Sequence, residues 1–317
     1  MIRYDKDKNS KPIFYMKGII NFLLPHNNFF LIQKRKTLLE KYKNDKLVLE
    51  RVNYYNKTSS FQIDESFISI KEFYKTKKKT YFFDLLKYLK YFNSNLKFKF
   101  LFGDITHIPN EPTIVKSRPI NDINQNSVIM KLNTVRHFIF VDDTLSFEEK
   151  LPKAVWRGKC YKKHREDFVQ QYYSKTFCDI GQTNTKGDIS VAWQKNKMSI
   201  EEQLKYKYLI AIEGNDVASN LKWAMSSNSL VMMAKPKFET WFMEGRLQEG
   251  YHYVLLKDDY SDLEEKINFY NQHPDKAQKI IEQAHLYINQ FLNHEIEDAI
   301  SIMILEKYFK NSQQITM

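Results

Sequence analysis

Residues 206–233 contain the feature that most constrains the fold: a strand, a small polar turn, a helix and a second strand in direct succession. The apolar run at 208–212 stops at Glu-Gly-Asn (213–215), and a helical pattern begins near Ser219. That helix ends at Ser-Ser-Asn, just before a second apolar run at 230–233. This succession is the repeating unit of a parallel β-sheet, so the segment predicts an α/β fold.

The turn inside this segment is a candidate ligand site. Parallel sheets bind ligands where the carboxyl end of a strand leads into a helix, and the free N–H groups of a helix start attract anions. We therefore expect a phosphate near Gly214, with hydrogen bonds from Asn215 and Ser219 to phosphate or ribose and positive charge from Lys222. A plain structural alternative is that Ser219 caps the helix, and both roles are compatible.

The alternation of strands and helices continues over about 140 residues and predicts an α/β domain. Ser199 and Glu202 have the spacing of a capping box at the start of one of its helices. Leu151-Pro152 marks a boundary, which gives domains at 1–150 and 151–290 and a C-terminal helix at 291–317 that packs back on the first domain. The expected strands are 154–156, 177–180, 208–212, 230–233 and 253–256, and the expected helices are 163–173, 198–205, 261–270, 274–292 and 296–309.

The composition excludes several classes of protein. The chain has only eight glycines and contains neither the G-x-G-x-x-G nor the G-x-x-x-x-G-K motif, which argues against dinucleotide oxidoreductases and P-loop enzymes. Its two cysteines, Cys160 and Cys178, fit no metal-binding spacing and indicate a reducing compartment. No convincing signal peptide is present, so we expect a cytoplasmic protein.

The positive charge is concentrated in the first third of the chain. Residues 1–100 contain 22 Lys and Arg against 9 Asp and Glu, whereas the remaining residues contain 27 against 29. This asymmetry indicates either a solvated surface or contact with an anionic partner, such as phospholipid headgroups, a phosphorylated glycolipid or nucleic acid. The apolar stretch 13–32 is too polar for a transmembrane helix, which leaves a core segment or a membrane-interface segment.

Other residues are candidates for chemistry. Arg157-Gly158 follows a strand, and Arg165 lies eight residues on, so the two arginines can clamp a diphosphate or serve a structural role. Glu239 follows a strand and a proline, a placement that suits hydrogen bonds to ribose hydroxyls but also an exposed helix start. Asp104 ends the strand candidate 98–102, where it can deprotonate a hydroxyl or simply form a turn after a glycine.

An acidic pair offers a rival centre. Asp142 and Asp143 follow the apolar run 138–141, an arrangement resembling the one that carries a divalent metal in single-domain sugar transferases. Neighbouring side chains of a strand point to opposite faces, so the two carboxylates need a turn in order to converge.

Several of these segments occur together in one family. The combination resembles glycosyltransferase family 90, which includes capsule-associated fungal transferases, animal protein O-glucosyltransferases and bacterial lipopolysaccharide-modifying enzymes. The likeness runs in order from about residue 97 to 290, and Lys-Ser-Arg-Pro at 116–119 is most similar to the bacterial branch. Its segments are Trp156-Arg157-Gly158, Arg165, Lys207-Tyr208, Glu213-Gly214-Asn215, Ser227-Asn228-Ser229 and His252-Tyr253.

The resemblance implies a GT-B architecture, in which two Rossmann-like domains face each other across a cleft. The C-terminal domain would bind a UDP-sugar, with Arg165 on the diphosphate and with Gly214, Asn215 and Ser219 in the donor loop. The N-terminal domain would bind the acceptor, with Asp104 as general base. Many relatives carry an arginine where Asn220 stands here, and Lys222 is the nearby residue that can replace its charge.

We therefore predict an inverting glycosyltransferase that moves a hexose from a UDP-sugar to a hydroxyl of a lipopolysaccharide core or a related surface glycan. The resemblance implies that protein charges stabilise the departing UDP without a metal or other cofactor. The basic N-terminal third would contact an anionic membrane peripherally, at the inner membrane, and would bind no nucleic acid. Two alternatives stay open, a metal-dependent transferase that uses Asp142 and Asp143, and a non-enzymatic basic protein that binds nucleic acid.

Overall fold

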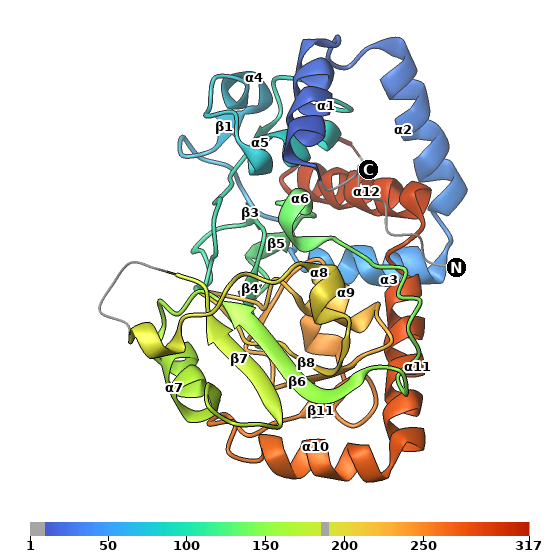
Figure 1. Cartoon of the computed structure of the whole chain (residues 1–317). Helices are drawn as coiled ribbons and strands as arrows, with labels where there is room; N and C mark the ends of the chain where they lie inside the picture. The colour runs from blue at the N-terminus through green and yellow to red at the C-terminus, as the bar shows by residue number, and fades with distance from the viewer. Residues whose placement is uncertain (1–9, 185–189, 317) are drawn as a thin grey trace. The chain divides into compact units, whose positions relative to one another are not determined.

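The computed structural model describes residues 10–184 and 190–316, and these form two compact units (Figure 1). Among the described residues, unit 1 holds 138–236 and 245–290. Unit 2 holds 10–137, 237–244 and 291–316. The change between the units therefore comes 13 residues before the boundary expected at Leu151, and the C-terminal segment belongs to the same unit as the N-terminal segment.

Unit 1 is built on one five-stranded parallel sheet, with the strand order β11-β9-β8-β6-β7. Strand β6 comes first in the sequence of this sheet and lies between β7 and β8, the second and third strands of the sheet in the sequence. This is one of the common strand orders of doubly wound α/β sheets. The sheet confirms the expected α/β class. The strands are β6 (Leu151–Gly158), β7 (Cys178–Gln182), β8 (Tyr206–Ile210), β9 (Leu230–Met233) and β11 (Val254–Leu255).

Continuous apolar runs explain these strands. All four residues of β9 and the last three of β8 are buried, as expected for strands that are covered on both faces. The capping box of Ser199 and Glu202 at the start of α8 is confirmed. The helices of unit 1 are α7 (Lys163–Tyr172), α8 (Ile200–Gln203), α9 (Leu221–Met225), α10 (Leu263–Gln272) and α11 (Pro274–Asn289), with a 3-10 turn at Val191–Trp193.

Unit 2 is mainly helical, and its strands pair only two by two in the part that the structure describes. Strands β1 (Ile68–Ser69) and β2 (Lys97–Phe98) are antiparallel, β3 (Thr113–Val115) and β5 (Ser127–Ile129) are parallel, and β4 (Arg118–Pro119) and β10 (Phe238–Glu239) are antiparallel. A second Rossmann-like sheet therefore stays a prediction. The helices are α1 (Lys11–Leu23), α2 (Phe29–Tyr42), α3 (Lys46–Tyr55), α4 (Ile70–Phe73), α5 (Thr80–Leu89), α6 (Thr134–His137) and α12 (His294–Asn311). A further 3-10 turn, Glu244–Arg246, begins at the end of unit 2's segment 237–244.

Two segments differ from what their composition suggests. Residues 138–141 form no strand, because the backbone N–H of Val141 donates to the hydroxyl of Ser226 at 2.9 Å instead of to a neighbouring strand. The segment 105–130, which is rich in Pro, Asn and Ser, contains the short strands β3, β4 and β5. Within the described residues, no helix has both the length and the apolar character needed to span a bilayer.

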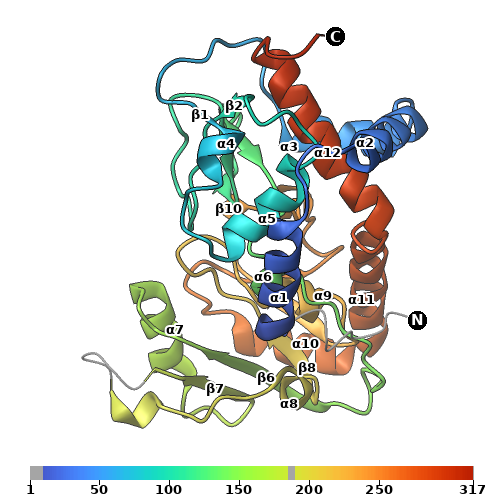
Figure 2. The ribbon, with the colours of Figure 1, turned by 90° about the horizontal axis from the view of Figure 1, so that it is seen from above.

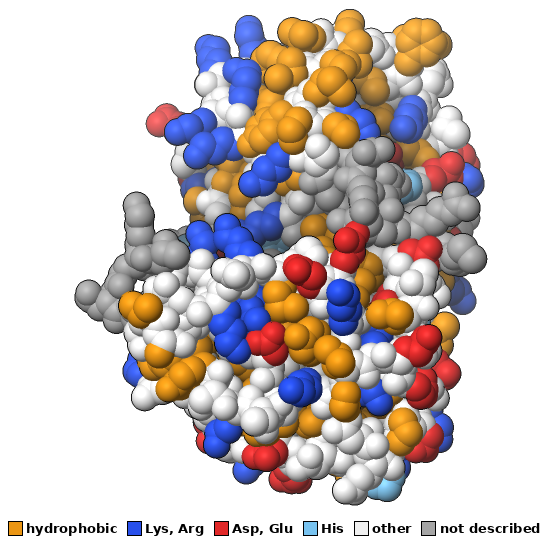
Figure 3. Space-filling model, viewed as in Figure 1, with side chains coloured by type: hydrophobic (Ala, Val, Ile, Leu, Met, Phe, Trp, Pro, Cys, Tyr) orange, Lys and Arg blue, Asp and Glu red, His pale blue; other side chains and the backbone are white. Residues whose placement is uncertain are grey.

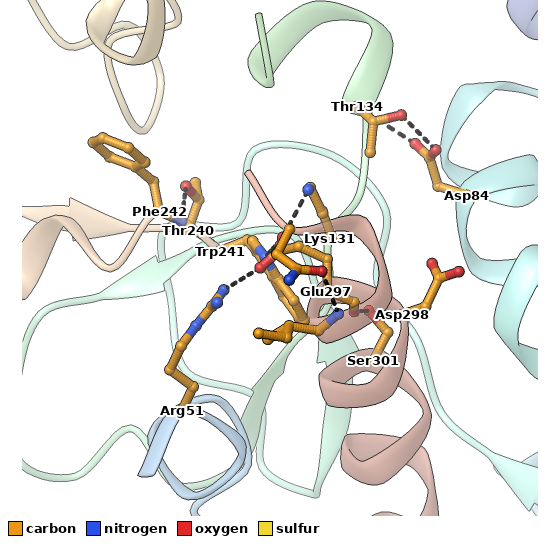
Figure 4. A network of polar contacts seen from close by, with 12 residues as sticks. Arg51, Asp84, Lys131, Thr134, Thr240, Trp241, Phe242, Glu297, Asp298 and Ser301 are labelled. Carbon is orange, nitrogen blue, oxygen red and sulfur yellow. Dashed lines mark hydrogen bonds and ion pairs between the residues drawn. The ribbon is translucent and has the colours of Figure 1, made fainter. Parts of the chain in front are cut away.

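A buried carboxylate joins separate segments of unit 2 (Figure 4). Glu297 of α12 accepts hydrogen bonds from Arg51 of α3 at 2.6 Å, from Lys131 at 2.7 Å and from the indole N–H of Trp241 at 2.7 Å. Its side chain is only 3% exposed. Burial alone would raise the pKa of Glu297, but the nearby charges of Lys131 and Arg51 outweigh it and hold that pKa below its usual range.

A second buried acid makes the stability of the protein depend on pH. Burial raises the pKa of Asp84 to about 7, although Thr134 donates to both carboxylate oxygens, at 2.7 and 2.9 Å. Between the unfolded pKa of 3.8 and about 7 the folded state binds the extra proton, so the free energy of unfolding falls as pH rises. The contribution of this group is at most about 1.4 kcal/mol per pH unit.

We therefore expect the difference in unfolding free energy between wild type and Asp84→Asn to change with pH. The asparagine variant should lose this part of the pH dependence, so it should gain stability relative to wild type from pH 4.5 to pH 8. Urea denaturation at several pH values measures this change. A difference that stays constant across the range would contradict the assignment.

Candidate functional site

The carboxyl ends of β6 and β8 form the candidate site of unit 1. In a doubly wound sheet, ligands bind at the point where the strand order reverses, and here that point lies between these two neighbouring strands. Strand β6 ends at Arg157-Gly158, and β8 runs into the Glu-Gly-Asn turn at 213–215. Two of the segments selected from the sequence therefore lie at the same edge of the sheet.

Arg165 connects the two strand ends. It lies in the first turn of α7, and its guanidinium donates to the carbonyl oxygens of Ile212 at 2.7 Å, Glu213 at 2.9 Å and Lys159 at 3.1 Å. The group also lies 5.6 Å from the ring of Trp156. These contacts place a permanent positive charge at the point where the strand order reverses.

The turn after β8 lies directly against this arginine. A Cβ on Gly214 would lie 3.4 Å from Nη2 of Arg165, at ordinary van der Waals contact, so the turn packs directly against the guanidinium. His164 also contacts this turn, with Nε2 at 2.9 Å from the carbonyl oxygen of Glu213. Asn215 is exposed and thus open to solvent. His164 was not predicted from the sequence, since nothing in its position distinguishes it from a surface residue.

The helix after this turn differs from the expectation. Helix α9 has five residues, and its N-cap is Asn220, so the alternative in which Ser219 caps the helix was wrong. The side-chain amide of Asn220 donates instead to the carbonyl oxygen of Ile210 at 2.9 Å. Lys222 is fully buried, 6.0 Å from the ring of Phe138. A helix this short adds little dipole, so the positive charge at this turn comes mainly from Arg165.

Arg157 and Gly158 contribute to structure at the end of β6. Arg157 donates to the carboxylate of Asp179 at 2.8 Å and to its backbone carbonyl at 2.7 Å. Burial would raise the pKa of Asp179, but hydrogen bonds from Lys195 and Arg157 outweigh it and hold the pKa at about 2. A Cβ on Gly158 would come within 2.4 Å of the Trp156 ring, so this position has no room for a side chain.

A cavity of about 740 Å³ adjoins Arg157 on the side of β7. Its wall includes Asp179, Lys195 and Glu202, so charges of both signs line it. Because Arg157 and Lys195 already compensate Asp179, the cavity offers less net positive charge than its arginine and lysines suggest.

Glu239 lies in unit 2 and not with the residues of the sheet. It belongs to β10, where its carboxylate accepts from Nε of Arg118 at 2.7 Å and from the hydroxyl of Tyr54. Both members of this ion pair are buried. The sequence placed Glu239 near the nucleotide because it follows β9 closely in the chain, but residues 237–244 belong to unit 2.

Asp104 is the candidate base of unit 2. It follows Gly103, whose φ of +122° is a backbone conformation that favours glycine. Nζ of Lys116 lies 2.5 Å from the carboxylate, and Lys116 is buried while the Asp104 side chain is 26% exposed. The hydroxyl of Ser117 bonds both the N–H and the carbonyl of Ile105, at 3.1 and 3.2 Å. The Lys-Ser-Arg-Pro segment thus holds Asp104 in place.

Asp143, one of the two aspartates of the alternative metal centre, is bound to other groups of the protein. The carboxylate of Asp143 accepts from Nζ of Lys150 at 2.7 Å and from the backbone N–H of Asn228 at 2.9 Å, and the side chain is 3% exposed. These contacts fix the start of β6 to the turn before β9. Over residues 10–184 and 190–316, no three His, Cys, Asp or Glu side chains are grouped as a metal site would require.

Fold and site together define a class of protein. Unit 1 is a doubly wound α/β unit with a fixed arginine and a close backbone turn at its reversal point, the arrangement with which such sheets bind phosphate-bearing ligands. Unit 2, considered by itself, has a partly exposed carboxylate, Asp104, held by a buried lysine.

Comparison with known proteins identifies the family. A family model described as glycosyl transferase family 90 matches residues 125–314. The chain is 42% identical to the O-glucosyltransferase LpsA of Dichelobacter nodosus over 82% of this chain and 81% of that protein. It is 32% identical to protein O-glucosyltransferase 2 of Danio rerio over 42% of this chain and 28% of that protein. The chain belongs to glycosyltransferase family 90 and is a glycosyltransferase.

The likeness to a human relative is more limited. The chain is 29% identical to protein O-glucosyltransferase 3 of Homo sapiens over 51% of this chain and 33% of that protein. These three relatives are sugar transferases, so they favour an enzyme over the basic nucleic-acid-binding protein that the charge of the chain also allowed.

Proposed function

We propose that this glycosyltransferase moves a hexose from a UDP-sugar to a hydroxyl of a lipopolysaccharide core or a related surface glycan, with inversion at the anomeric carbon. The observation that carries the proposal is the pair of sites in the two units, an arginine fixed at the reversal point of the sheet and a carboxylate held by a buried lysine. The GT-B arrangement of two Rossmann-like domains is part of this proposal.

Unit 1 holds the donor. The diphosphate of UDP lies near Arg165 and the backbone of Gly214 and Asn215, and Ser219 donates to the donor from the same loop. Arg165 is suited to this role because its guanidinium is permanently charged and already anchored by three carbonyls, so little ordering is needed on binding. Arg157 and Gly158 act by shaping the end of β6, and Lys222 adds long-range positive charge from its buried position.

Unit 2 supplies the base. Asp104 accepts the proton of the acceptor hydroxyl as its oxygen bonds to the anomeric carbon and the bond from that carbon to UDP breaks. The electron pair leaves with UDP, whose negative charge Arg165 stabilises without a metal ion or other cofactor. Lys116 orients Asp104, because its ammonium lies at hydrogen-bond distance from one carboxylate oxygen.

The acceptor assignment rests on the relative with the widest match. That relative is an O-glucosyltransferase named LpsA, and the match covers most of both chains. A lipopolysaccharide core is phosphorylated and carried by a membrane. Its negative charge complements the first hundred residues, which contain 22 basic and 9 acidic side chains. The enzyme would then act at the inner membrane as a peripheral protein.

A metal-dependent transferase is the competing proposal. It requires Asp143 as a metal ligand, although the Asp143 carboxylate is buried against Lys150 and Asn228. Transfer that persists in EDTA at an unchanged rate supports the metal-independent reaction. Loss of activity in EDTA that returns with added Mn²⁺ or Mg²⁺ would favour the competitor.

Arg165→Ala should weaken UDP binding by about 10- to 100-fold, because a charged hydrogen-bonding group contributes about 1.5–3 kcal/mol. The variant loses the guanidinium and also the three bonds that hold the turn. Calorimetric titration with UDP measures the effect. Lys163→Ala is the matched control, because this residue of the same helix turn is exposed and pairs only with Asp167 in the described contacts. Equal affinity in both variants would refute the donor site.

One reaction tests the proposed function as a whole. Purified enzyme is incubated with a panel of UDP-hexoses and a truncated lipooligosaccharide in the presence of EDTA, and the product linkage is read by NMR. We expect transfer from one UDP-hexose with a β linkage formed from the α-linked donor. Retention of configuration, or no transfer from any UDP-hexose, would contradict the proposal.

A further inference from the structure

Unit 2 exposes a group of large apolar side chains on α1 and on the turn into α2. We call this group the apolar tip. Hydrophobic side chains gather over these two helices in Figure 3, with Lys and Arg beside them. Contiguous apolar surface of this kind marks an interaction site in a folded protein. The members, each 50% to 80% exposed, are Met16, Ile19, Ile20, Leu23, Leu24, Phe29 and Phe30.

The opposite side of α1 is already packed. Figures 1 and 2 show α1 lying along α5, and these two helices are in contact. Gly18 lets them approach closely, since a Cβ there would come within 2.6 Å of the Phe83 ring. The rings of Phe14 and Phe22 contact Phe83 and Phe82 on the same side. The exposed residues therefore form a second apolar face, in addition to the one that α1 needs in order to fold.

The segment that carries the apolar tip is basic, although Lys34 and Arg35 of α2 pair with Asp298 and Glu306 of α12. Residues 10–39 contain five Lys and Arg, and the stretch contains no Asp or Glu. Lys11 and Lys17 of α1 are exposed, as is the run 77–79, and Nζ of Lys78 lies 4.8 Å from the Phe22 ring. A surface that combines basic and apolar side chains in this way fits the headgroup region of an anionic bilayer.

A polar cavity of about 540 Å³ lies at the turn between α1 and α2. His26 lines it with Nδ1 bonded to the Tyr74 hydroxyl at 2.8 Å. Lys71 and the polar groups of Asn27, Asn93 and Ser94 complete the lining. These are donors for phosphate or sugar oxygens, so a lipid headgroup can be bound beside the inserted side chains.

We propose that the apolar tip and its lysines bind the surface of an anionic phospholipid bilayer, with the apolar side chains in the interface and the lysines on headgroup phosphates. A second copy of the chain fits less well, because it would bring two basic surfaces together. The inference deepens the proposed function, in that a membrane-carried acceptor places the enzyme at a bilayer. The binding itself requires no turnover.

Sedimentation of the full chain with vesicles tests this surface. We expect binding to vesicles of phosphatidylcholine with phosphatidylglycerol, and little binding to phosphatidylcholine alone. The double variants Leu23→Ser with Leu24→Ser, and Phe29→Ser with Phe30→Ser, should each lower the partition coefficient at least about tenfold. Leu47→Ser is the matched control, since this leucine of α3 is 75% exposed but lies outside the tip, and its variant should bind like wild type.

Three results would overturn the proposal. Wild-type protein that fails to bind anionic vesicles would do so, as would tip variants that bind like wild type. Light scattering that detects a dimer of wild type, dissociated by the tip variants, together with no vesicle binding, would assign the surface to self-association. Vesicle binding without any sugar transfer would support this surface while contradicting the proposed function, so the two failures are distinguishable.

Discussion

Asp104→Asn should lower the turnover number of sugar transfer by about 10²- to 10⁴-fold, the range over which general bases contribute to catalysis. Asparagine has nearly the same shape as aspartate but cannot accept the proton of the acceptor hydroxyl. The side chain is partly exposed and lies against a buried lysine, so it is both accessible and oriented. Affinity for UDP should stay unchanged, because the proposed donor site is in unit 1.

Two variants make this result specific. Asp122→Asn is the matched control, because it changes an exposed aspartate of the same unit and should transfer sugar at the normal rate. His107→Ala tests whether a nearby imidazole is the base instead, since His107 follows Asp104 closely in the sequence and is exposed. A normal rate for Asp104→Asn, or a larger loss for His107→Ala, would show that the base is assigned wrongly.

Glu297→Gln should destabilise the protein by about 3–5 kcal/mol, the cost of removing one partner of a buried ion pair. Glutamine fills nearly the same volume, so the loss comes from charge and not from a cavity. Without the carboxylate, Arg51 and Lys131 lie close to each other with no anion between them, and the indole N–H of Trp241 loses a charged acceptor. Urea denaturation at neutral pH measures the change.

The control for this variant lies two residues earlier on the same helix. Glu295 also pairs with a lysine, Lys41, but both side chains are more than half exposed, and solvent screens exposed pairs so that they contribute little to stability. Glu295→Gln should therefore change the free energy of unfolding little. Equal losses in the two variants would mean that the buried network contributes no more than a surface pair.

Unit 1 could be predicted from the sequence because its signals are local. Each strand is an apolar run bounded by small polar residues, and β9 begins and ends at the expected residues, 230 and 233. The capping box at Ser199 likewise depends on residues three positions apart. The order of the strands in the sheet was not predicted. It depends on which apolar segments pair with each other, and the sequence of one strand does not indicate its neighbour.

Unit 2 was harder because its contacts join distant parts of the chain. Strand β10 pairs with β4 across more than a hundred residues, and each is only two residues long. The partners of Glu297 come from positions 51, 131 and 241. No local period indicates such pairings.

The sequence indicated which residues to consider for the candidate site, but it did not indicate the contacts that those residues make. Arg165, Gly214 and Asp104 were selected from motif and resemblance, and their roles in catalysis and donor binding stay predictions. The partners of Arg165 are backbone carbonyls, which no side-chain pattern can reveal. Lys116 was visible only as part of the Lys-Ser-Arg-Pro segment, and its contact with Asp104 required the fold.

Mass spectrometry of the lipooligosaccharide from the producing bacterium, with and without this gene, tests the central claim most directly. We predict that deletion removes one hexose from the core and that wild-type enzyme restores it, whereas Asp104→Asn does not. Identical glycan masses in the two strains, or full restoration by Asp104→Asn, would contradict a family 90 transferase that acts on this acceptor through this carboxylate.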